Sequence, residues 1–179
     1  CSRALGAHET PPAEPWPRQE LGTYVSEPGE ALPAFVRRVG RVVFEFTKQS
    51  GHEACGSLGK SGDRYATILG SDGVQNGCLV RRSRLPERFV HTGESIHSHP
   101  VQEGSLRLTE RDLAWWKAQG LSRPDRTFTR KPGFSRSDFQ GGPGWLIEGV
   151  VVLHQDGPGR VRRHGVIAPR WEPPGDVLE

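Results

Sequence analysis

Two histidines in the segment HSHP, His97 and His99, are the residues of this 179-residue chain whose type and spacing point most directly to chemistry. In an extended strand, residues two positions apart point to the same face, so both imidazoles can converge on one metal ion while Ser98 points away. Two histidines held in this way supply half of a tetrahedral zinc site. A lone His-x-His carries little information, so the remaining groups must come from other segments.

Two further segments offer those groups. Glu53 lies in the segment HEACGSL, where a carboxylate on a short strand could act as a general base beside the metal and Gly56 would allow close backbone approach. Ser135 and Asp138 lie three residues apart in the segment FSRSD, and they share one face if this segment turns helically. Asp138 would then be the third metal ligand.

Taken together, these segments resemble the JAMM (JAB/MPN) metallopeptidase family, whose pattern is a Glu on an early strand, then His-x-His-Pro, then Ser-x-x-Asp. The matching residues here are Glu53, His97, His99, Ser135 and Asp138. The resemblance implies an α/β fold, namely a single JAMM-like (cytidine-deaminase-like) domain with a central mixed β-sheet flanked by helices. It implies Zn²⁺ as the cofactor.

The third ligand has two candidates. The family usually places Ser-x-x-Asp soon after the second histidine, and the segment TERD, from Thr109 to Asp112, has that outline with Thr for Ser. Without any metal, Thr109 could be the N-cap of a helix and Asp112 an acidic residue in its first turn, where such residues are favoured. The distal Asp138 precedes a glycine-rich turn, which looks like an extracellular-type variant of the domain. We therefore expect Asp138 as the ligand and Asp112 as the alternative, with residues 101–133 as an insertion.

The resemblance also implies a reaction, the hydrolysis of a peptide or isopeptide bond. Zinc held by two imidazoles and one carboxylate keeps a position open for water and lowers the pKa of that water toward neutrality. Glu53 would take the proton and deliver it to the leaving amine, and Ser135 would donate a hydrogen bond to the oxyanion, worth about 3 kcal/mol. The expected substrate is a peptide or protein, such as a cell-wall peptide or a ubiquitin-like tail. The alternative is a catalytically inactive JAMM-like binding module in the cell envelope.

The start of the chain points to the cell envelope. The sequence begins at Cys1, contains no methionine and continues into a polar stretch rich in proline. This start resembles a mature bacterial lipoprotein, cut just before a lipidated cysteine. We therefore expect residues 1–30 to be a tether that holds a periplasmic or cell-envelope domain, residues 31–170, at the membrane through its lipid. Residues 171–179 would form a C-terminal tail.

Cys55 and Cys78 have two readings. In an exported domain they face an oxidising compartment and could form a disulfide. They could equally be two small buried thiols, because free cysteine is among the most buried residue types.

Composition narrows the class of protein. The 23 glycines and 15 prolines argue against a helical bundle, and no apolar run approaches the roughly 20 residues of a membrane span. The net charge is +3, but the arginines are spread among 21 acidic residues. We therefore expect no nucleic-acid partner.

The elements that must position the site follow from periodicity. Apolar residues at three- and four-residue spacing predict an amphipathic helix from Pro33 to just before Gly51. Thr109 as N-cap predicts a second helix to Gly120. Shorter apolar runs bounded by turn residues predict strands near residues 53–58, 64–69, 77–80, 93–99, 145–153 and 160–166, and a basic loop is expected over residues 121–133.

Overall fold

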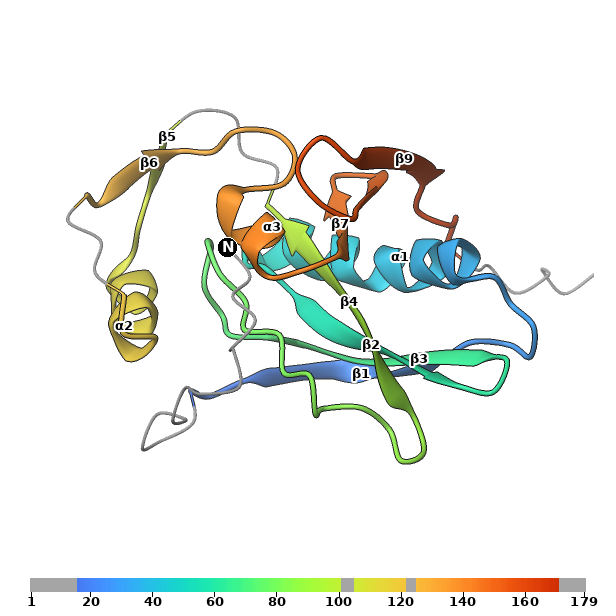
Figure 1. The fold of residues 1–179 in the computed structure, drawn as a ribbon. Helices are drawn as coiled ribbons and strands as arrows, with labels where there is room; N and C mark the ends of the chain where they lie inside the picture. The colour runs from blue at the N-terminus through green and yellow to red at the C-terminus, as the bar shows by residue number, and fades with distance from the viewer. Residues whose placement is uncertain (1–15, 101–104, 122–124, 171–179) are drawn as a thin grey trace, which may run out of the picture.

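The computed structural model describes residues 16–100, 105–121 and 125–170, and it shows an α/β fold built on a mixed sheet (Figure 1). Seven strands form this sheet in the order β1-β3-β2-β4-β7-β8-β9, and β5 and β6 form a separate pair. Strands β4 and β7 are parallel, whereas the other neighbours are antiparallel. The prediction of an α/β domain with a central mixed sheet is confirmed.

The strands are β1 (Gln19–Val25), β2 (Cys55–Ser61), β3 (Arg64–Ser71), β4 (Val90–His99), β5 (Ser105–Arg107), β6 (Thr127–Thr129), β7 (Gly144–Glu148), β8 (Val151–Gln155) and β9 (Val161–Val166). The helices are α1 (Leu32–Ser50), α2 (Glu110–Ala118) and α3 (Arg136–Gln140). Among the described residues, no helix has the length and apolar character needed to cross a membrane.

Helix α1 packs on one face of the sheet and builds the main core. Its valines, spaced three and four residues apart, are buried together with Ile96 of β4 and Ile147 of β7. Gly40 permits the close approach, because a Cβ at this position would lie 2.9 Å from Ile147 Cδ1. The helix ends at Gly51, which adopts the left-handed conformation with φ 72°. The predicted first helix is confirmed.

The predicted tether over residues 1–30 is wrong for its second half. Strand β1 pairs with β3 at the edge of the sheet, and Leu21 and Tyr24 pack against the main core. Trp16 Nε1 also donates a hydrogen bond to the carbonyl of Asp72 at 2.8 Å. The partial burial of Leu21 and Tyr24 and the pairing with β3, which a bulge interrupts between Glu20 and Gly22, offset the entropy lost when this segment is ordered. Residues 1–15 of that tether and the predicted tail, residues 171–179, lie outside the described residues.

The predicted insertion contains an arm formed by β5, α2 and β6, on the left of Figure 1. Helix α2 has the predicted N-cap at Thr109, and Trp115 buries its side chain against Val74 and Leu79. The basic stretch expected to be a loop contains β6, which pairs with β5.

Two strand predictions need correction. Residues 77–80 form a loop, whose apolar side chains are buried through packing and not through strand pairing. The apolar run 145–153 is two strands, β7 and β8, joined by a tight turn in which Gly149 has φ 56°. An apolar run by itself does not show where the chain reverses.

Candidate metal centre

Strand β4 presents His97 and His99 on one face of the sheet and Ser98 on the other, as the spacing predicted. Ser98 Oγ lies 2.6 Å from Thr47 Oγ1 of helix α1 and accepts a hydrogen bond from the backbone N–H of Ala54 at 3.0 Å. Because β2 and β7 pair with this part of β4 on its two sides, the backbone under both imidazoles is fixed. Both histidines are buried.

Helix α3 brings Asp138 to these histidines. Ser135 is the N-cap of the helix, and its hydroxyl accepts a hydrogen bond from the N–H of Asp138. In return, Asp138 Oδ2 accepts from the N–H of Ser135 at 2.6 Å. This reciprocal capping box orients the carboxylate, whose oxygens lie 3.4 Å from His97 Nε2 and 3.5 Å from His99 Nε2.

The three side chains form a group that can hold a metal ion. One ligand atom from each of His97, His99 and Asp138 lies within 4.8 Å of the others, and all three residues are buried. Both ring nitrogens of His97 and Nδ1 of His99 are buried without a hydrogen-bond partner among the described residues. Buried polar atoms are rarely left unpaired, so these nitrogens point to a missing ligand. Two imidazoles and one carboxylate are a donor set that suits Zn²⁺.

The protonation states of the group also suit a cation. Burial and the neighbouring His97 lower the pKa of His99 well below 6.5, so its ring is neutral at pH 7. Burial alone would raise the pKa of Asp138, but its interactions with His97 and, more weakly, with His99 more than offset burial and hold that pKa far below its usual range. A neutral imidazole and an ionised carboxylate are the forms that bind metal.

Glu53 lies two residues before β2, on the side of the sheet where β2 pairs with β4. The antiparallel pairing of β2 with β4 sets Cys55 opposite His97, and the N–H of Ser98 donates to the carbonyl of Ala54 at 2.9 Å. Continuing this register places Glu53 opposite His99, and directly opposite residues project to the same face of a sheet. Gly56 allows β2 to pack closely against β3, because a Cβ at this position would lie 2.5 Å from Thr67 Oγ1.

An arginine that sequence reasoning missed, Arg130, contacts Glu53. Its two terminal nitrogens lie 3.4 Å from Glu53 Oε1, and Nη2 also donates to the carbonyl of Gln75 at 2.8 Å. Glu53 has no exposed surface. The only sequence signal for this contact was the basic character of the stretch that follows α2, which does not indicate a partner.

Asp112, the alternative third ligand, lies elsewhere. It occupies the first turn of α2, where it forms a capping box with Thr109. Its Oδ1 accepts from the N–H of Gln75 at 2.8 Å, and its Oδ2 accepts from the N–H of Thr109 at 2.7 Å. Through these hydrogen bonds, the Asp112 carboxylate holds the arm against the 72–80 loop. The group that can hold a metal contains Asp138 and not Asp112.

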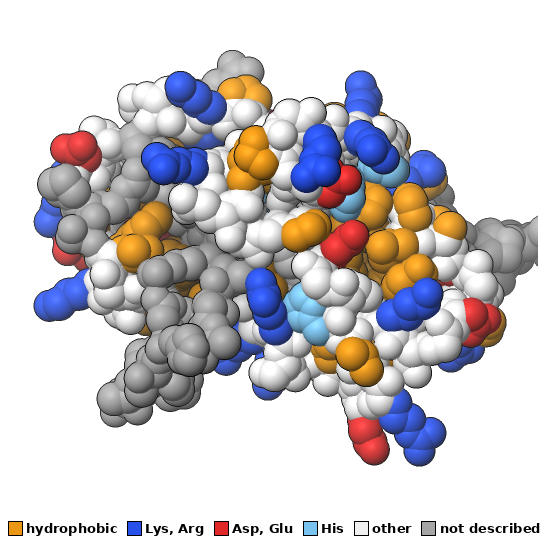
Figure 2. Space-filling model, viewed as in Figure 1, with side chains coloured by type: hydrophobic (Ala, Val, Ile, Leu, Met, Phe, Trp, Pro, Cys, Tyr) orange, Lys and Arg blue, Asp and Glu red, His pale blue; other side chains and the backbone are white. Residues whose placement is uncertain are grey.

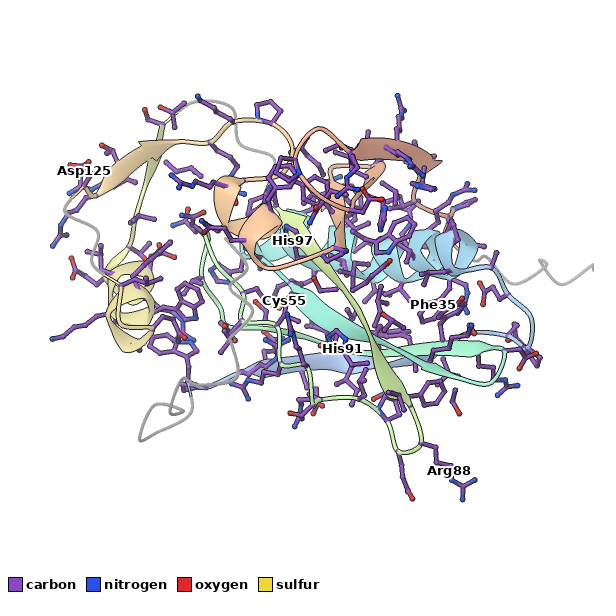
Figure 3. The ribbon with its side chains drawn as sticks, in the orientation of Figure 1. Phe35, Cys55, Arg88, His91, His97 and Asp125 are labelled. Carbon is purple, nitrogen blue, oxygen red and sulfur yellow. A yellow bond between two sulfur atoms is a disulfide. The ribbon has the colours of Figure 1, made fainter. Side chains whose placement is uncertain are left out.

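A disulfide joins Cys55 and Cys78, with a Cα–Cα distance of 5.9 Å, so the pairing that the sequence left open is present. Figure 3 shows Cys55 close to His97, its partner across the two strands. The guanidinium of Arg18 lies 3.6 Å from Cys78 Sγ and pairs with Asp72 Oδ1 at 3.2 Å. The disulfide therefore fastens the 72–80 loop to β2, the strand that pairs with β4 beside His97.

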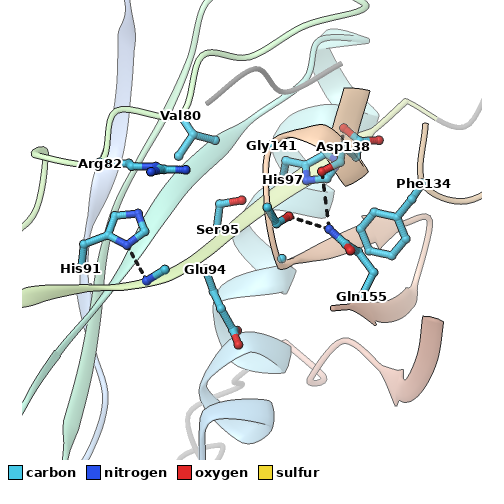
Figure 4. A pocket seen from close by; sticks show the side chains of 13 residues that line it. Val80, Arg82, His91, Glu94, Ser95, His97, Phe134, Asp138, Gly141 and Gln155 are labelled. Carbon is cyan, nitrogen blue, oxygen red and sulfur yellow. Dashed lines mark hydrogen bonds and ion pairs between the residues drawn. The ribbon is translucent and has the colours of Figure 1, made fainter. Parts of the chain in front are cut away.

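A pocket opens from the candidate metal centre along β4 (Figure 4). His97 and Asp138 line one end, where the ring of Phe134 packs edge-on against His97 with centroids 6.0 Å apart. Over the face in Figure 2, basic and acidic side chains are interspersed and form no single block.

Comparisons with models of known protein families, with curated proteins and with solved structures gave no match for this chain. Its function must therefore be inferred from the residues of the site.

Proposed function

We propose that this chain is a zinc-dependent hydrolase of JAMM type that cleaves a peptide or isopeptide bond, with a JAMM-like fold around the mixed sheet. The observation that carries the proposal is the convergence of the buried side chains of His97, His99 and Asp138, in which three imidazole nitrogens have no hydrogen-bond partner among the described residues. Ser135 caps the helix turn that holds Asp138, and the register of β2 on β4, continued by two residues, brings Glu53 opposite His99. A buried group of this composition is costly unless a cation compensates it.

The residues divide the chemistry among them. When bound, zinc would supply a Lewis acid and a water of lowered pKa. His97, His99 and Asp138 hold the ion. The carboxylate of Glu53 accepts a proton and passes it to the leaving amine. Ser135 orients Asp138 through its capping hydrogen bond, and its hydroxyl proton is available to the oxyanion of the substrate.

The disulfide supports an oxidising compartment for this domain. We therefore propose that this domain works in an oxidising compartment, such as the periplasm or cell envelope. In that compartment, a cell-wall peptide or an exported protein is a more reasonable substrate than a ubiquitin-like tail. No nucleic-acid partner is proposed.

One observation favours the second candidate, a catalytically inactive binding module with the same fold. Arg130 already contacts the proposed base, Glu53, in a shielded environment. If that ion pair persists with substrate bound, Glu53 cannot act as a base, and the domain would bind peptides without cutting them.

The two candidates are separated by metal content and turnover. Protein purified without chelators is analysed for zinc and then incubated with a mixed peptide library, with Glu53→Gln as the control. About one zinc per chain and cleavage that Glu53→Gln abolishes support the enzyme. Zinc-loaded protein that binds peptides but leaves all of them intact contradicts the enzyme and supports the binding module.

A further inference from the structure

The pocket beside the candidate metal centre has a second, basic end. His97 and Asp138 stand at one end, while Arg82 and His91 line the other (Figure 4). Arg82 belongs to a cluster of three arginines, with Arg81 and Arg84, between β3 and β4. The pocket shows that one of them, Arg82, faces the same space as the metal group.

The guanidinium of Arg82 has no ion pair with a carboxylate of the described residues. Its neighbours do have partners, because Arg84 pairs with Glu20 at 2.7 Å and Arg81 donates to the carbonyl of Trp16 at 3.3 Å. The side chain of Arg82 is exposed, so it meets solvent or a ligand. Its positive charge is therefore available at the end of the pocket.

His91 adds a hydrogen-bond donor at the same place. Its Nδ1 accepts from the N–H of Gly93 at 2.6 Å, which assigns the proton of the neutral ring to Nε2. Burial and the neighbouring charge of Arg82 lower the pKa of His91, so the ring is neutral at pH 7. Together, Arg82 and His91 present donors only.

The acidic residues of the pocket do not neutralise this end. Glu94 accepts a hydrogen bond from Trp145 Nε1 at 2.6 Å and lies 3.4 Å from His154 Nε2. In Figure 4 its side chain points away from Arg82. Asp138 belongs to the metal group at the far end. The donors at the basic end therefore favour an anion from outside the chain.

Glycines line the surface between the two ends of the pocket. Gly93, Gly141, Gly142 and Gly144 line the pocket and present no side chains. His91 precedes His97 by six positions on β4, a separation of at most about 20 Å at roughly 3.3 Å per residue. An extended peptide spans that distance with about six residues.

We propose that Arg82 and His91 form a subsite for a carboxylate side chain of the peptide substrate, within about six residues of the bond that is cut. This inference rests on the proposed peptidase function. It names the substrate class as acidic peptides and adds Arg82 as a residue that determines specificity.

The test uses a library of decapeptides, blocked at both ends, with cleavage sites read by mass spectrometry. A best-cleaved sequence is then resynthesised with Asp, Asn or Lys at the enriched position. We expect Asp to exceed Asn by about three- to fivefold in kcat/KM, the range of an exposed ion pair. Arg82→Glu should reverse the preference toward Lys. The matched control is Arg84→Glu, on the same loop but outside the pocket lining, and it should keep the preference for Asp.

Each outcome is decisive. Cleavage without an acidic preference, or an equal effect of the two arginine variants, overturns the subsite and leaves the peptidase proposal intact. If the zinc-loaded protein cuts no peptide, the peptidase proposal fails and the subsite fails with it. Fluorescence anisotropy with zinc-loaded Glu53→Gln protein provides a reading without turnover, because the Asp peptide should bind more tightly than the Lys peptide.

Discussion

The guanidinium of Arg130 lies against the carboxylate of Glu53, with both terminal nitrogens 3.4 Å from Oε1. The residues are 77 positions apart, and the pair joins the end of the arm to the strand that enters the sheet beside the candidate metal centre. Side-chain exposure is 9% for Arg130 and zero for Glu53, so solvent does not screen the contact well. The arm therefore shapes the electrostatic surroundings of the proposed base.

Removing this positive charge should strengthen metal binding. Arg130 is among the charges that lower the pKa of His99, so its charge acts at the ligand group. We expect Arg130→Gln to bind Zn²⁺ about three- to tenfold more tightly, on the order of 1 kcal/mol for one charge near a partly shielded site. Competition with a chromophoric chelator measures the affinity.

The matched control for this change is Arg126→Gln. Arg126 also belongs to the segment after α2, but it pairs with the exposed Glu110. This variant should leave the zinc affinity unchanged. An Arg130→Gln affinity equal to that of wild type would contradict the electrostatic link between the arm and the metal centre.

The two capping boxes allow the structural and metal-positioning roles of Ser135 to be separated. Ser135→Ala and Thr109→Ala each remove an N-cap, and each should lower the free energy of unfolding by about 1 kcal/mol. Only Ser135→Ala should also weaken zinc binding, because Ser135 orients Asp138. Urea unfolding and zinc competition on both variants give the comparison. Equal zinc affinities in the two variants would refute the positioning role.

Reduction of the disulfide should destabilise the domain. Cys55 and Cys78 close a loop with a sequence separation of 23, for which the chain-entropy model gives about 3 kcal/mol. We expect a thiol reductant to lower the urea midpoint of the wild type. The double variant Cys55→Ser/Cys78→Ser should start at the lower midpoint and should not respond to reductant. A wild-type midpoint that reductant does not change would contradict the disulfide.

The metal-free protein should lose stability on acidification, in part through His99. Because its pKa in the folded protein lies well below 6.5, the unfolded chain binds more protons than the folded chain just below pH 6.5. The free energy of unfolding contributed by this residue is therefore present above pH 6.5 and falls as the pH drops below that value. In urea unfolding from pH 7.5 to 5.5, His99→Gln should lose less stability than wild type. Parallel losses in the two proteins would show that His99 is not the group responsible.

Local spacing explains which parts of the site could be predicted from sequence. His97 and His99 share a face because strand geometry alternates, and Ser135 with Asp138 matches the geometry of an N-cap box. Helix α1 was predictable because the spacing of its apolar residues and the proline and glycine at its two ends all indicate a helix with the same bounds.

The remaining features depend on contacts between distant segments. Strand β1 forms because β3 offers a free edge, although the neighbouring prolines suggested a tether. Arg130 meets Glu53 only because Asp112 and Gln75 dock the arm beside the 72–80 loop. Neither relationship leaves a periodic signal in the sequence.

The most direct test of the account is a crystal structure of the protein grown with zinc, with anomalous data collected at the zinc edge. We predict one anomalous peak bounded by His97, His99 and Asp138, at about 2.0–2.2 Å from one atom of each residue. We also predict that Asp138→Asn loses this peak and that Asp112→Asn keeps it. No peak between the two histidines, or a peak ligated by Asp112, would contradict the account.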